Sequence, residues 1–343
     1  MKPLKIAFLY NIRHHYPDAN DPRTQLEADF DDPKTIEVMI KHIEQCGYDV
    51  LPIEADQQAY FELYRYKNEI DMVFNYAEGL YGKDRESHLP AMLEMLQIPY
   101  TGSAPLTQAI VLNKAKTKEI LIANHIPTLP FQVFYTPRSE RSGLNRNLRF
   151  PLIVKPVSQG SSAGIINKSV VNNTDELARQ VDWVHRTFSQ PALIEPFLMG
   201  REFSVAMLGN PPEILPIIEA DHSVLPENYY PLDSLEVKWY VEEEGGEDHL
   251  ICPAQLNDRP KTQIKEMCYQ LWSALRICDW CRVDIRCDQM GNPYVLEVNS
   301  PAGILPPEIS TTSYFPLAAR CAGIEYEVLI QRIIDTARKR YNV

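Results

Sequence analysis

The sequence predicts an α/β protein, and two observations support this fold class. Near the N-terminus, apolar strand patterns alternate with a helical pattern, which is typical of a parallel sheet with right-handed crossovers. Near the C-terminus, two strand patterns flank a turn at Gly291 and predict an antiparallel hairpin. The length of 343 residues suggests about two domains, and the order of the elements divides the chain further into three units, 1–104, 105–192 and 193–343.

The first unit has the clearest pattern. A buried strand is predicted at 5–10, and the helix after it has Asp32 as its N-cap and Pro33 at its first position. This helix ends at Gly47, and its apolar residues recur at helical spacing: Ile36, Met39, Ile40 and Ile43. Two more strand patterns, YDVLPI and IDMVFN, precede a helix at 86–96. Because function in parallel sheets concentrates at the carboxyl ends of strands, the loop FNYAEG is a candidate functional segment.

The second and third units mix short strands with helices. A helix that ends before Pro127 opens the second unit, and the strand patterns FQVFYT, FPLIVKP and SAGIINKS lead to a helix at 174–187. The third unit contains the hairpin and closes on a helix from about 324 to 340. The region 220–250, with its acidic run VEEEGGED, is either a long mobile loop or a solvated surface excursion.

The composition excludes several classes of partner. A net charge of -12 and a pI near 5.2 argue against nucleic acid or an anionic membrane surface, since phosphate recognition needs a basic face. No apolar run approaches 18 residues, and the first residues have a strand pattern rather than that of a signal peptide. The seven cysteines are an odd number in a large chain, which favours reduced thiols. We therefore expect a cytoplasmic protein.

Three of the cysteines superficially resemble a metal knuckle: Cys278, Cys281 and Cys287. A structural zinc site needs four ligands, usually in two pairs. The third cysteine instead alternates with Val283 and Ile285 along a predicted strand. Zinc stays an alternative, and small buried apolar side chains are the favoured interpretation.

The terminal hairpin carries a set of oxygen ligands. Glu297 and Asn299 are two residues apart on one strand and share a face, and Asp284 on the other strand can lie across from them. Two carboxylates and an amide oxygen form a site suited to Mg²⁺ bound with phosphates. Arg282 shares this face, being two residues before Asp284. Exposed strands often carry such charges, so the pattern alone does not decide between a metal site and a polar surface.

A small-residue turn follows a lysine at the end of an apolar run, in the stretch PLIVKPVSQGSSAGI at 151–165. Such turns hold phosphates, yet the stretch matches neither common motif. Gly160 is followed by two serines rather than by Lys and Ser or Thr, and GxGxxG is missing from its usual place. Because Lys155 precedes the glycines, the arrangement is inverted relative to a P-loop.

An ordered series of motifs resembles the ATP-grasp enzymes of the D-alanine–D-alanine ligase type. The series is LNKAKTK, IVKPVSQGSSAG, IEPFLMGRE, EVKW, RVD and EVNSPAG, and the resemblance extends from Lys5 to the last helix. It implies an ATP-grasp fold, in which an N-terminal parallel α/β domain is followed by two α+β domains that clasp ATP. It also implies that the turn after Lys155 is a flap over the ATP phosphates, with Ser161 above the reacting acid.

The resemblance implies a role for each matching residue in binding ATP and metal. In that family, lysines at these positions hold the α- and β-phosphates and the γ-phosphate, and acidic residues bind adenine, ribose and two Mg²⁺ ions, with Mn²⁺ as an alternative. The phosphate lysines here are Lys114, Lys155 and, for the γ-phosphate, Lys238. The adenine and ribose positions are Glu195, the backbone of Phe197 and Leu198, and Glu202. The metal positions are Asp284, Glu297 and Asn299.

The same resemblance implies the reaction. A carboxylate attacks the γ-phosphate to form an acyl phosphate, and an amine then attacks the acyl carbon, so the metal ions and lysines must neutralise the crowded negative charge. Arg282 and the backbone N–H of Gly303 match the donors that stabilise the tetrahedral oxyanion. Ser313 matches the serine that holds the second substrate's carboxylate, although ILPPEISTT makes the link before it longer than usual.

Two further departures concern the first substrate. The family has a glycine-rich turn and an acid that binds the substrate ammonium, and here the segment 11–33 replaces them, so the acid is predicted to be missing. Trp239 stands where the family has a tyrosine, and indole donates one hydrogen bond but accepts none. Glu78 is a candidate ammonium partner, the alternative being an exposed loop acid.

Three functions remain open. The first is a carboxylate–amine ligase that joins an amino acid, or an amino-acid-like acid, to an amine other than D-alanine. The second is a D-alanine–D-alanine ligase with divergent loops. The third is a nucleotide-binding protein without catalysis, which is disfavoured because each phosphate and metal position holds a competent residue. The expected partners are small amino acids or peptides, and the resemblance also implies a homodimer.

Overall fold

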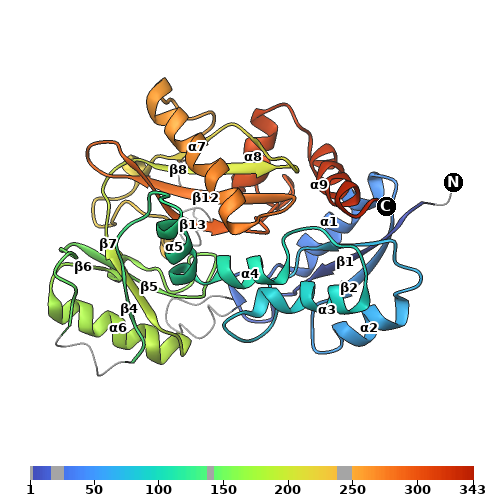
Figure 1. Ribbon diagram of the computed structural model, residues 1–343, viewed down its shortest axis with the longest axis horizontal. Coiled ribbons are helices and arrows are strands. Elements are labelled where there is room, and N and C mark those ends of the chain that lie inside the picture. Colours follow the sequence, from blue (N-terminus) through green and yellow to red (C-terminus); the bar gives the residue numbers. More distant parts are fainter. Residues whose placement is uncertain (1–2, 17–26, 137–142, 238–248) are drawn as a thin grey trace.

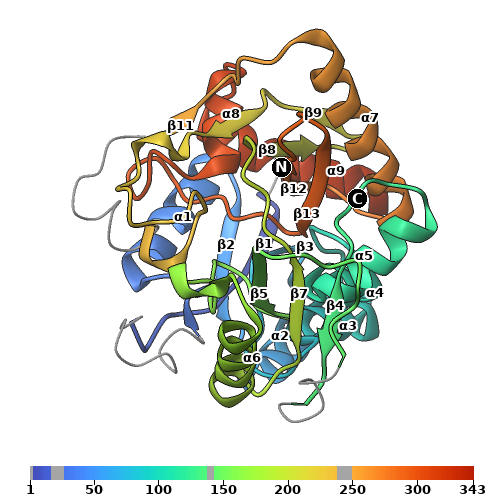
Figure 2. The same ribbon diagram turned by 90° about the vertical axis from the view of Figure 1, so that its left-hand side faces the viewer.

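The computed structural model describes residues 3–16, 27–136, 143–237 and 249–343. Its strands form three separate sheets, with helices packed around them (Figures 1 and 2). The predicted positions Lys238 and Trp239, together with the acidic run at 241–248, lie outside the described residues.

The first sheet is parallel, as predicted, and its strand order is β2-β1-β3. Its strands are β1 (Lys5–Tyr10), β2 (Asp49–Glu54) and β3 (Met72–Asn75). The helices of this region are α1 (Pro33–Gln45), α2 (Ala59–Tyr66), the short 3-10 helix η2 (Arg85–Ser87) and α3 (His88–Leu96). The start of α1 at Pro33 and the positive φ of Gly47 just past its end confirm the predicted helix.

The central sheet is antiparallel, with the strand order β4-β7-β5-β6. Its strands are β4 (Gln132–Phe134), β5 (Leu152–Pro156), β6 (Val170–Val171) and β7 (Ala192–Pro196). The helices nearby in the chain are α4 (Pro105–Leu112), α5 (Lys114–Ala123), η3 (Asn167–Ser169) and α6 (Thr174–Phe188). The predicted unit limit at 192/193 stays a prediction, and this sheet extends to Pro196.

The strand predicted for SAGIINKS at 162–169 is wrong. Residues 161–164 turn instead, because Ser161, Ser162 and Gly164 all have positive φ, which no strand residue has. The 3-10 helix η3 follows, and the extended backbone begins only at Val170.

The third sheet contains the predicted hairpin. Its strand order is β11-β10-β8-β12-β13, with β9 added beside β8. The strands are β8 (Glu202–Leu208), β9 (Glu213–Ile214), β10 (Ile218–Ala220), β11 (Leu250–Ile251), β12 (Trp280–Cys287) and β13 (Pro293–Asn299). The helices are η4 (His222–Val224), α7 (Asp258–Leu275), α8 (Tyr314–Cys321) and α9 (Tyr326–Tyr341).

The cysteines of the hairpin strand are core residues. Cys281 and Cys287 are buried in the apolar cluster beneath β12, where Val283 and Ile285 point to the same side. This arrangement confirms the favoured interpretation over a zinc site. All seven cysteines of the chain are free thiols.

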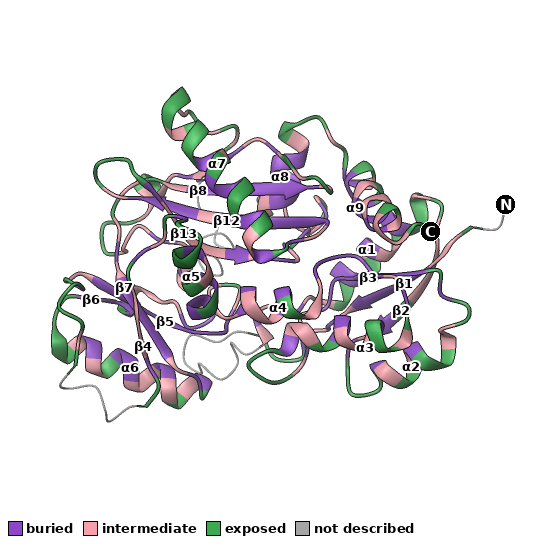
Figure 3. Cartoon of the chain, in the orientation of Figure 1, coloured by how far each residue is buried: buried purple, intermediate pink, exposed green. Residues whose placement is uncertain are grey.

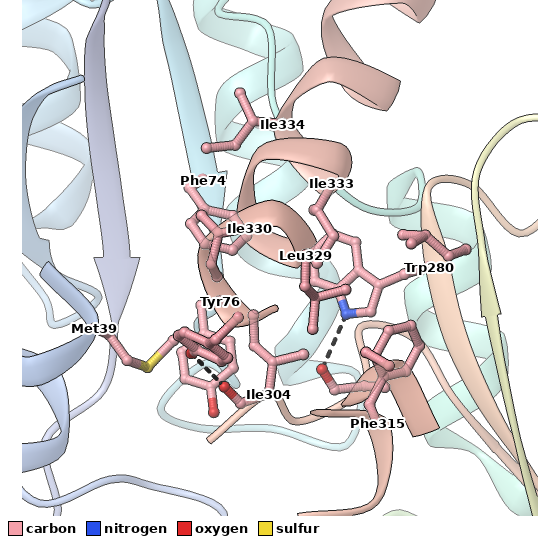
Figure 4. Close-up of a cluster of buried hydrophobic side chains, with 14 of the residues drawn as sticks. Met39, Phe74, Tyr76, Trp280, Ile304, Phe315, Leu329, Ile330, Ile333 and Ile334 are labelled. Carbon is pink, nitrogen blue, oxygen red and sulfur yellow. Dashed lines mark hydrogen bonds between the residues drawn. The ribbon is translucent and has the colours of Figure 1, made fainter. Parts of the chain in front are cut away.

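One apolar core joins the first and third sheets, whose buried strands are visible in Figure 3. Phe8 and Phe74 of the first sheet pack into the same cluster as Trp280 of β12 and the inner face of α9 (Figure 4). The indole N–H of Trp280 donates to the carbonyl of Ala302 at 3.0 Å. The central sheet has its own smaller core. Among the described helices, none combines the length and apolar character that a membrane crossing requires.

A buried carboxylate reinforces this union of two sheets. Asp279, just before β12, has no exposed surface and accepts from the N–H of Gly102 at 2.7 Å and the side chain of Asn210 at 2.7 Å. The guanidinium of Arg340 on α9 donates to the same carboxylate at 2.8 Å and to the carbonyl of Tyr100 at 2.9 Å. Asp279 therefore ties the segment after β3, the turn after β8 and α9 together.

We predict that Asp279→Asn lowers the free energy of unfolding by about 2–4 kcal/mol, because Arg340 keeps its charge and loses its partner in a largely buried place. Urea denaturation of the full chain measures this loss. The control Asp182→Asn removes an exposed carboxylate 3.3 Å from Arg186 and should cost less than about 1 kcal/mol. Equal losses in the two variants would contradict the role of Asp279.

Candidate active site

Two adjoining cavities lie where the sheets meet. The larger one, of about 760 Å³, is lined by the segments 28–35, 159–161 and 297–312 and by the loop after β3. The smaller one, of about 80 Å³, lies between the central and third sheets, next to β5, β7, β8, β12 and β13. Arg282 and Glu297 line both cavities. These two side chains therefore form a common border of the two cavities.

The smaller cavity collects the residues predicted to bind the nucleotide. Lys155, Glu195, Phe197, Leu198 and Glu202 all line it. The ring of Phe197 packs edge-on against Tyr230, with the centroids 5.5 Å apart, and Arg286 lies 5.2 Å from the same ring. Its lining thus combines an aromatic surface with buried charges, a composition typical of a site for a planar polar ligand.

Glu195 is the most enclosed charge of the site. It is 1% exposed, and its two oxygens lie 2.6 Å from the ammonium of Lys118 and 2.8 Å from that of Lys155. Burial alone would raise the pKa of Glu195, but the two ammonium groups outweigh it and lower this pKa to about 2. Glu195 is therefore ionised and links α5, β5 and β7.

Lys118 was missed by the sequence analysis. Its signal was present in LNKAKTK, because Lys114 and Lys118 are four residues apart and so share a helix face. Both ammonium groups point towards the site: that of Lys114 lies 3.2 Å from Glu297 and donates to the carbonyl of Gln159 at 2.5 Å. The helix begins at Lys114 because Asn113 caps it by accepting from the N–H of Lys116.

The structure brings the three predicted metal ligands together. Asp284 of β12 pairs directly with Glu297 of β13, and Asn299 pairs with Arg282 on the same face. Asp284 accepts from the side chains of Ser204 at 2.9 Å and Asn299 at 3.0 Å. Within the described ranges, no group of three or more His, Cys, Asp or Glu side chains suits a metal ion. The set here has two carboxylates and one amide, and such hard oxygen donors suit Mg²⁺.

Arg282 lies at the border between the two cavities. Its guanidinium donates to Asp284 through Nε at 3.0 Å and through a terminal nitrogen at 2.8 Å, and it lies 5.3 Å from the ring of Tyr314. Burial works to lower the pKa of Arg282, but the neighbouring Asp284 raises it, so the guanidinium stays charged. Tyr314, which the sequence analysis did not select, donates in turn to Asp233.

Glu202 shares the floor of the smaller cavity with a second arginine. Arg286 donates to Glu202 at 2.6 Å and also to the carbonyl of Pro231. Burial raises the pKa of Glu202 in spite of this partner. The two charges lie on adjacent strands, because Glu202 of β8 pairs with Arg286 of β12.

The predicted flap lies against the N-terminal segment. Ser161 lines the larger cavity, and Gly160 is so close to Asp29 that a Cβ atom on it would lie 2.6 Å from the carboxylate. Ser162 donates to the carbonyl of Asp233 at 2.7 Å. The small residues of this turn therefore permit a close approach of two chain segments, which a larger side chain at 160 would prevent.

The segment 11–33 brings three acids to the larger cavity, although whether one of them replaces the acid predicted to be missing after the first strand stays a prediction. Asp29, Asp31 and Asp32 are 19 or more residues beyond β1, but the chain returns so that all three line the larger cavity. A parallel bridge between Ile12 and Asp31 holds this return in place. Sequence spacing could not reveal the return, since residues 17–26 intervene.

Glu78 and Glu86 line the same cavity. Burial raises the pKa of Glu78 and raises that of Glu86 to about 7, the neighbouring Asp29 acts in the same direction on both, and Arg85 opposes it. Arg85 also pairs with Asp29 at 2.9 Å. This end of the cavity is therefore rich in acids and suits a cationic group.

The other end of the cavity has the residues predicted to serve the amine. Gly303 lines it, together with the hydroxyl residues Ser310, Thr311 and Thr312 of the longer link. Ser313 occupies the N-cap position of α8 and is not among the residues that line either cavity. Ser310, Thr311 and Thr312 thus supply hydroxyl groups to the cavity, whereas the sequence predicted that Ser313 would supply one.

We predict that Glu195→Gln lowers the free energy of unfolding by about 3–5 kcal/mol near pH 7, because two buried ammonium groups lose their partner. The lowered pKa means that the stabilisation is present above the usual range of a glutamate and is lost as pH falls towards about 2. Urea denaturation at several pH values measures both effects. Glu119→Gln, at an exposed pair on the same helix, should cost under about 1 kcal/mol, and a similar loss in both variants would contradict the prediction.

Comparisons with known proteins agree on one family. The model of the D-ala D-ala ligase C-terminus matches residues 120–335. A D-alanine–D-alanine ligase of Pelotomaculum thermopropionicum is 33% identical over 288 residues, which cover 81% of this chain and 84% of that protein. The uncharacterized protein y4sG of Sinorhizobium fredii is 34% identical over 310 residues, covering 88% and 87%. The crystal structure of the Bacillus anthracis D-alanine–D-alanine ligase complexed with ATP superposes with a TM-score of 0.72, 25% identity and 99% coverage of both chains. This chain therefore belongs to the D-alanine–D-alanine ligase family and has its ATP-grasp fold.

Proposed function

We propose that this chain, an ATP-dependent carboxylate–amine ligase of the D-alanine–D-alanine ligase family, joins an amino acid or amino-acid-like acid to an amine and releases ADP. The observation that carries the proposal is the meeting of the two cavities at Arg282 and Glu297. One cavity has the lysines and acids that suit a nucleotide, and the other is large and acid-lined at one end. Phosphoryl transfer between them needs this adjacency.

In this proposal ATP spans both cavities: the adenine and ribose enter the smaller one, which must widen from about 80 Å³, and the phosphates reach Lys114 and Glu297 in the larger one. Glu195 accepts from the adenine amino group beside the backbone of Phe197 and Leu198, and Glu202 binds the ribose. An ionised carboxylate has about four acceptor positions, so the contacts of Glu195 with Lys118 and Lys155 leave capacity for adenine. Lys114 and Lys155 hold the α- and β-phosphates, and Lys238 meets the γ-phosphate.

The proposed metal ions are two Mg²⁺, with Mn²⁺ as an alternative, held by Asp284, Glu297 and Asn299. The fit rests on the donor set: two carboxylates and an amide lie on one face of the hairpin, next to Lys114. Bound there, the ions would neutralise the charge of the β- and γ-phosphates. Arg282 and Asn299 now hold the carboxylate of Asp284, so they fix its orientation in the hairpin.

The chain's own groups then serve the second half of the reaction. The amine attacks the acyl phosphate, and the oxygen of the tetrahedral intermediate gains charge. We assign its stabilisation to the guanidinium of Arg282 and the N–H of Gly303, which line the same cavity. Ser161 of the flap lies above the acid, and closure of the flap excludes water from the acyl phosphate.

The substrates are proposed from the walls of the larger cavity. Asp29, Asp31 and Glu78 supply carboxylates for the ammonium group of the first substrate, and the hydroxyls at 310–312 face the amine that joins it. The volume of about 760 Å³ has to hold the phosphates and metal ions at Lys114, Glu297 and Asn299 as well as the substrates. A D-alanine–D-alanine ligase stays the alternative, and so does a nucleotide-binding protein without catalysis. A homodimer and a cytoplasmic location, where the seven thiols stay reduced, remain parts of the proposal.

We predict that D-alanine alone supports little ADP release and that another amino acid or larger acid supports more. Three departures from the family led to this expectation. Asp29 and Asp31 line the cavity and weaken the first, which was the lack of an acid after the first strand. The second, Trp239, lies outside the described residues, and the third, the longer link before Ser313, lines the cavity. The test is steady-state ADP release with D-alanine and with a panel of amino acids and dipeptides. D-alanine as the best substrate would establish the alternative ligase, whereas no release with any substrate would favour the non-catalytic protein.

The variant Glu297→Gln is the control for this screen. An amide at the metal site weakens Mg²⁺ where phosphate charge is greatest, so every substrate-dependent release of ADP should disappear while the fold persists. Release that survives in Glu297→Gln would come from another enzyme in the preparation or from a site without Glu297.

We predict that Arg282→Lys lowers kcat at least about a hundredfold, because a lysine lacks the planar, forked donors of a guanidinium. The corresponding loss of about 2.7–4 kcal/mol is that of one oxyanion donor. The matched control is Arg286→Lys on the same strand, which should change the KM for ATP more than kcat, since Arg286 contacts Glu202. A loss of less than threefold in Arg282→Lys would make Arg282 a charge of the strand surface only.

A further inference from the structure

The link between Gly303 and Ser313 is a folded wall rather than a loose loop. Ile304 is buried, and its carbonyl accepts from the hydroxyl of Tyr326 on α9 at 2.6 Å. The N–H groups of Ile309 and Ser310 both donate to the carbonyl of Pro306, at 2.9 and 3.0 Å. Arg320 of α8 donates to the carbonyl of Thr311 at 2.5 Å. We call residues 304–312 the link wall.

The inner side of the link wall faces the substrate cavity. Leu305 and Ile309 are the apolar members of the lining, and Ser310, Thr311 and Thr312 supply hydroxyl groups. The other wall here is the start of α1, where Asp32 and Thr35 line the same cavity.

A histidine of α1 holds the outer side of the link wall. His42 is buried, and its Nε2 lies 3.2 Å from Glu308 of the link wall, while its Nδ1 lies 2.9 Å from Glu327 of α9. The two ring nitrogens of His42 therefore connect the link wall with the start of α9 through one buried side chain. The ring also packs edge-on against Tyr326, with the centroids 4.8 Å apart.

The same helix face connects His42 with the cavity. Thr35 and His42 are seven residues apart, which is about two helical turns, and both are buried on the side of α1 that meets the link wall and α9. A shift of Glu308 away from His42 would therefore change the distance between the link wall and the start of α1.

We propose that the link wall selects the amine substrate and that His42 is the positioning residue that holds this wall against α1. This inference rests on the proposed ligase function and specifies its second substrate site. The hydroxyls at 310–312 suit an amine with a hydrogen-bonding group of its own, and Leu305 and Ile309 suit an apolar portion between that group and the nitrogen.

Polar groups surround His42 on several sides. Glu308 faces it from the link wall, and Glu327 faces it from the start of α9. Arg320, Glu325 and Tyr326 line the small cavity beside the ring, and Cys46 at the end of α1 donates to the carbonyl of Glu327. The contact between His42 and Glu308 therefore joins the link wall to both α1 and the start of α9.

The test measures which substrate constant changes in His42→Gln. With ATP and the acid at saturation, ADP release is measured against the amine found in the substrate panel. The KM for the amine should rise roughly tenfold, since one charge-assisted contact is lost, while kcat and the KM values for ATP and the acid stay within about threefold. Glu44→Gln, at an exposed position on the same helix, is the control and should leave all four constants unchanged.

A double-mutant cycle excludes a purely structural effect. Glu308→Gln should raise the KM for the amine as His42→Gln does, and the double variant should be no worse than either one. Additive effects of the two substitutions would overturn the proposal.

Hydrogen exchange separates the failure of this inference from that of the ligase function. The amides of 304–312 should exchange faster in His42→Gln than in the wild type and in Glu44→Gln, whatever the enzyme does. If none of the tested substrates makes the wild type release ADP, the ligase function fails. The exchange result alone then decides whether His42 holds the link wall. If release is normal and exchange is unchanged, the proposed role of His42 is wrong.

Discussion

The site depends on one buried carboxylate with two ammonium partners. Burying the carboxylate of Glu195 would cost much free energy without the ammonium groups of Lys118 and Lys155. The same cost applies to each lysine without Glu195. Because these three side chains come from β7, α5 and β5, their two ion pairs hold α5 against the central sheet. The position of Lys114, one turn before Lys118, follows from this constraint, and with it the contact to Glu297 across the cavity border.

The same logic of paired charges extends along the border between the cavities. Asp284 orients Arg282, and Arg286 is oriented by Glu202, so each charge on the face of β12 has a counter-charge within hydrogen-bonding distance. Such a surface is ordered before any ligand arrives, which lowers the cost of reorganisation when charge develops in a reaction. The acids at 31, 78 and 86 are different, because burial raises the pKa of each, and a cation bound among them would favour their ionised forms.

The sequence predicted those parts of the molecule that depend on local pattern. The start of α1 at Pro33, the hairpin turning at Gly291 and the shared face of Asp284, Glu297 and Asn299 follow from periodicities of two and 3.6 residues. The residues that the motif order proposes for adenine, ribose and one phosphate lie on or next to β5, β7 and β8. The return of the chain to Asp29 could not be predicted, since it depends on a bridge between Ile12 and Asp31 that has no periodic signal. The same holds for the partnership of His42 with Glu308, which are 266 residues apart.

The core shared by β1 and α9 has a consequence for synthesis on the ribosome. Phe8 and Phe74 emerge early, but their packing partners Trp280 and Ile330 are made more than 200 residues later. At roughly 5–20 residues per second, the first sheet waits on the order of 10–50 s with one apolar face uncovered. The central sheet, with a core of its own between 134 and 194, can fold during that interval. The first sheet also has a cluster of its own on its other face, between 7 and 100, so only the face that awaits Trp280 and Ile330 is the part most in need of a chaperone.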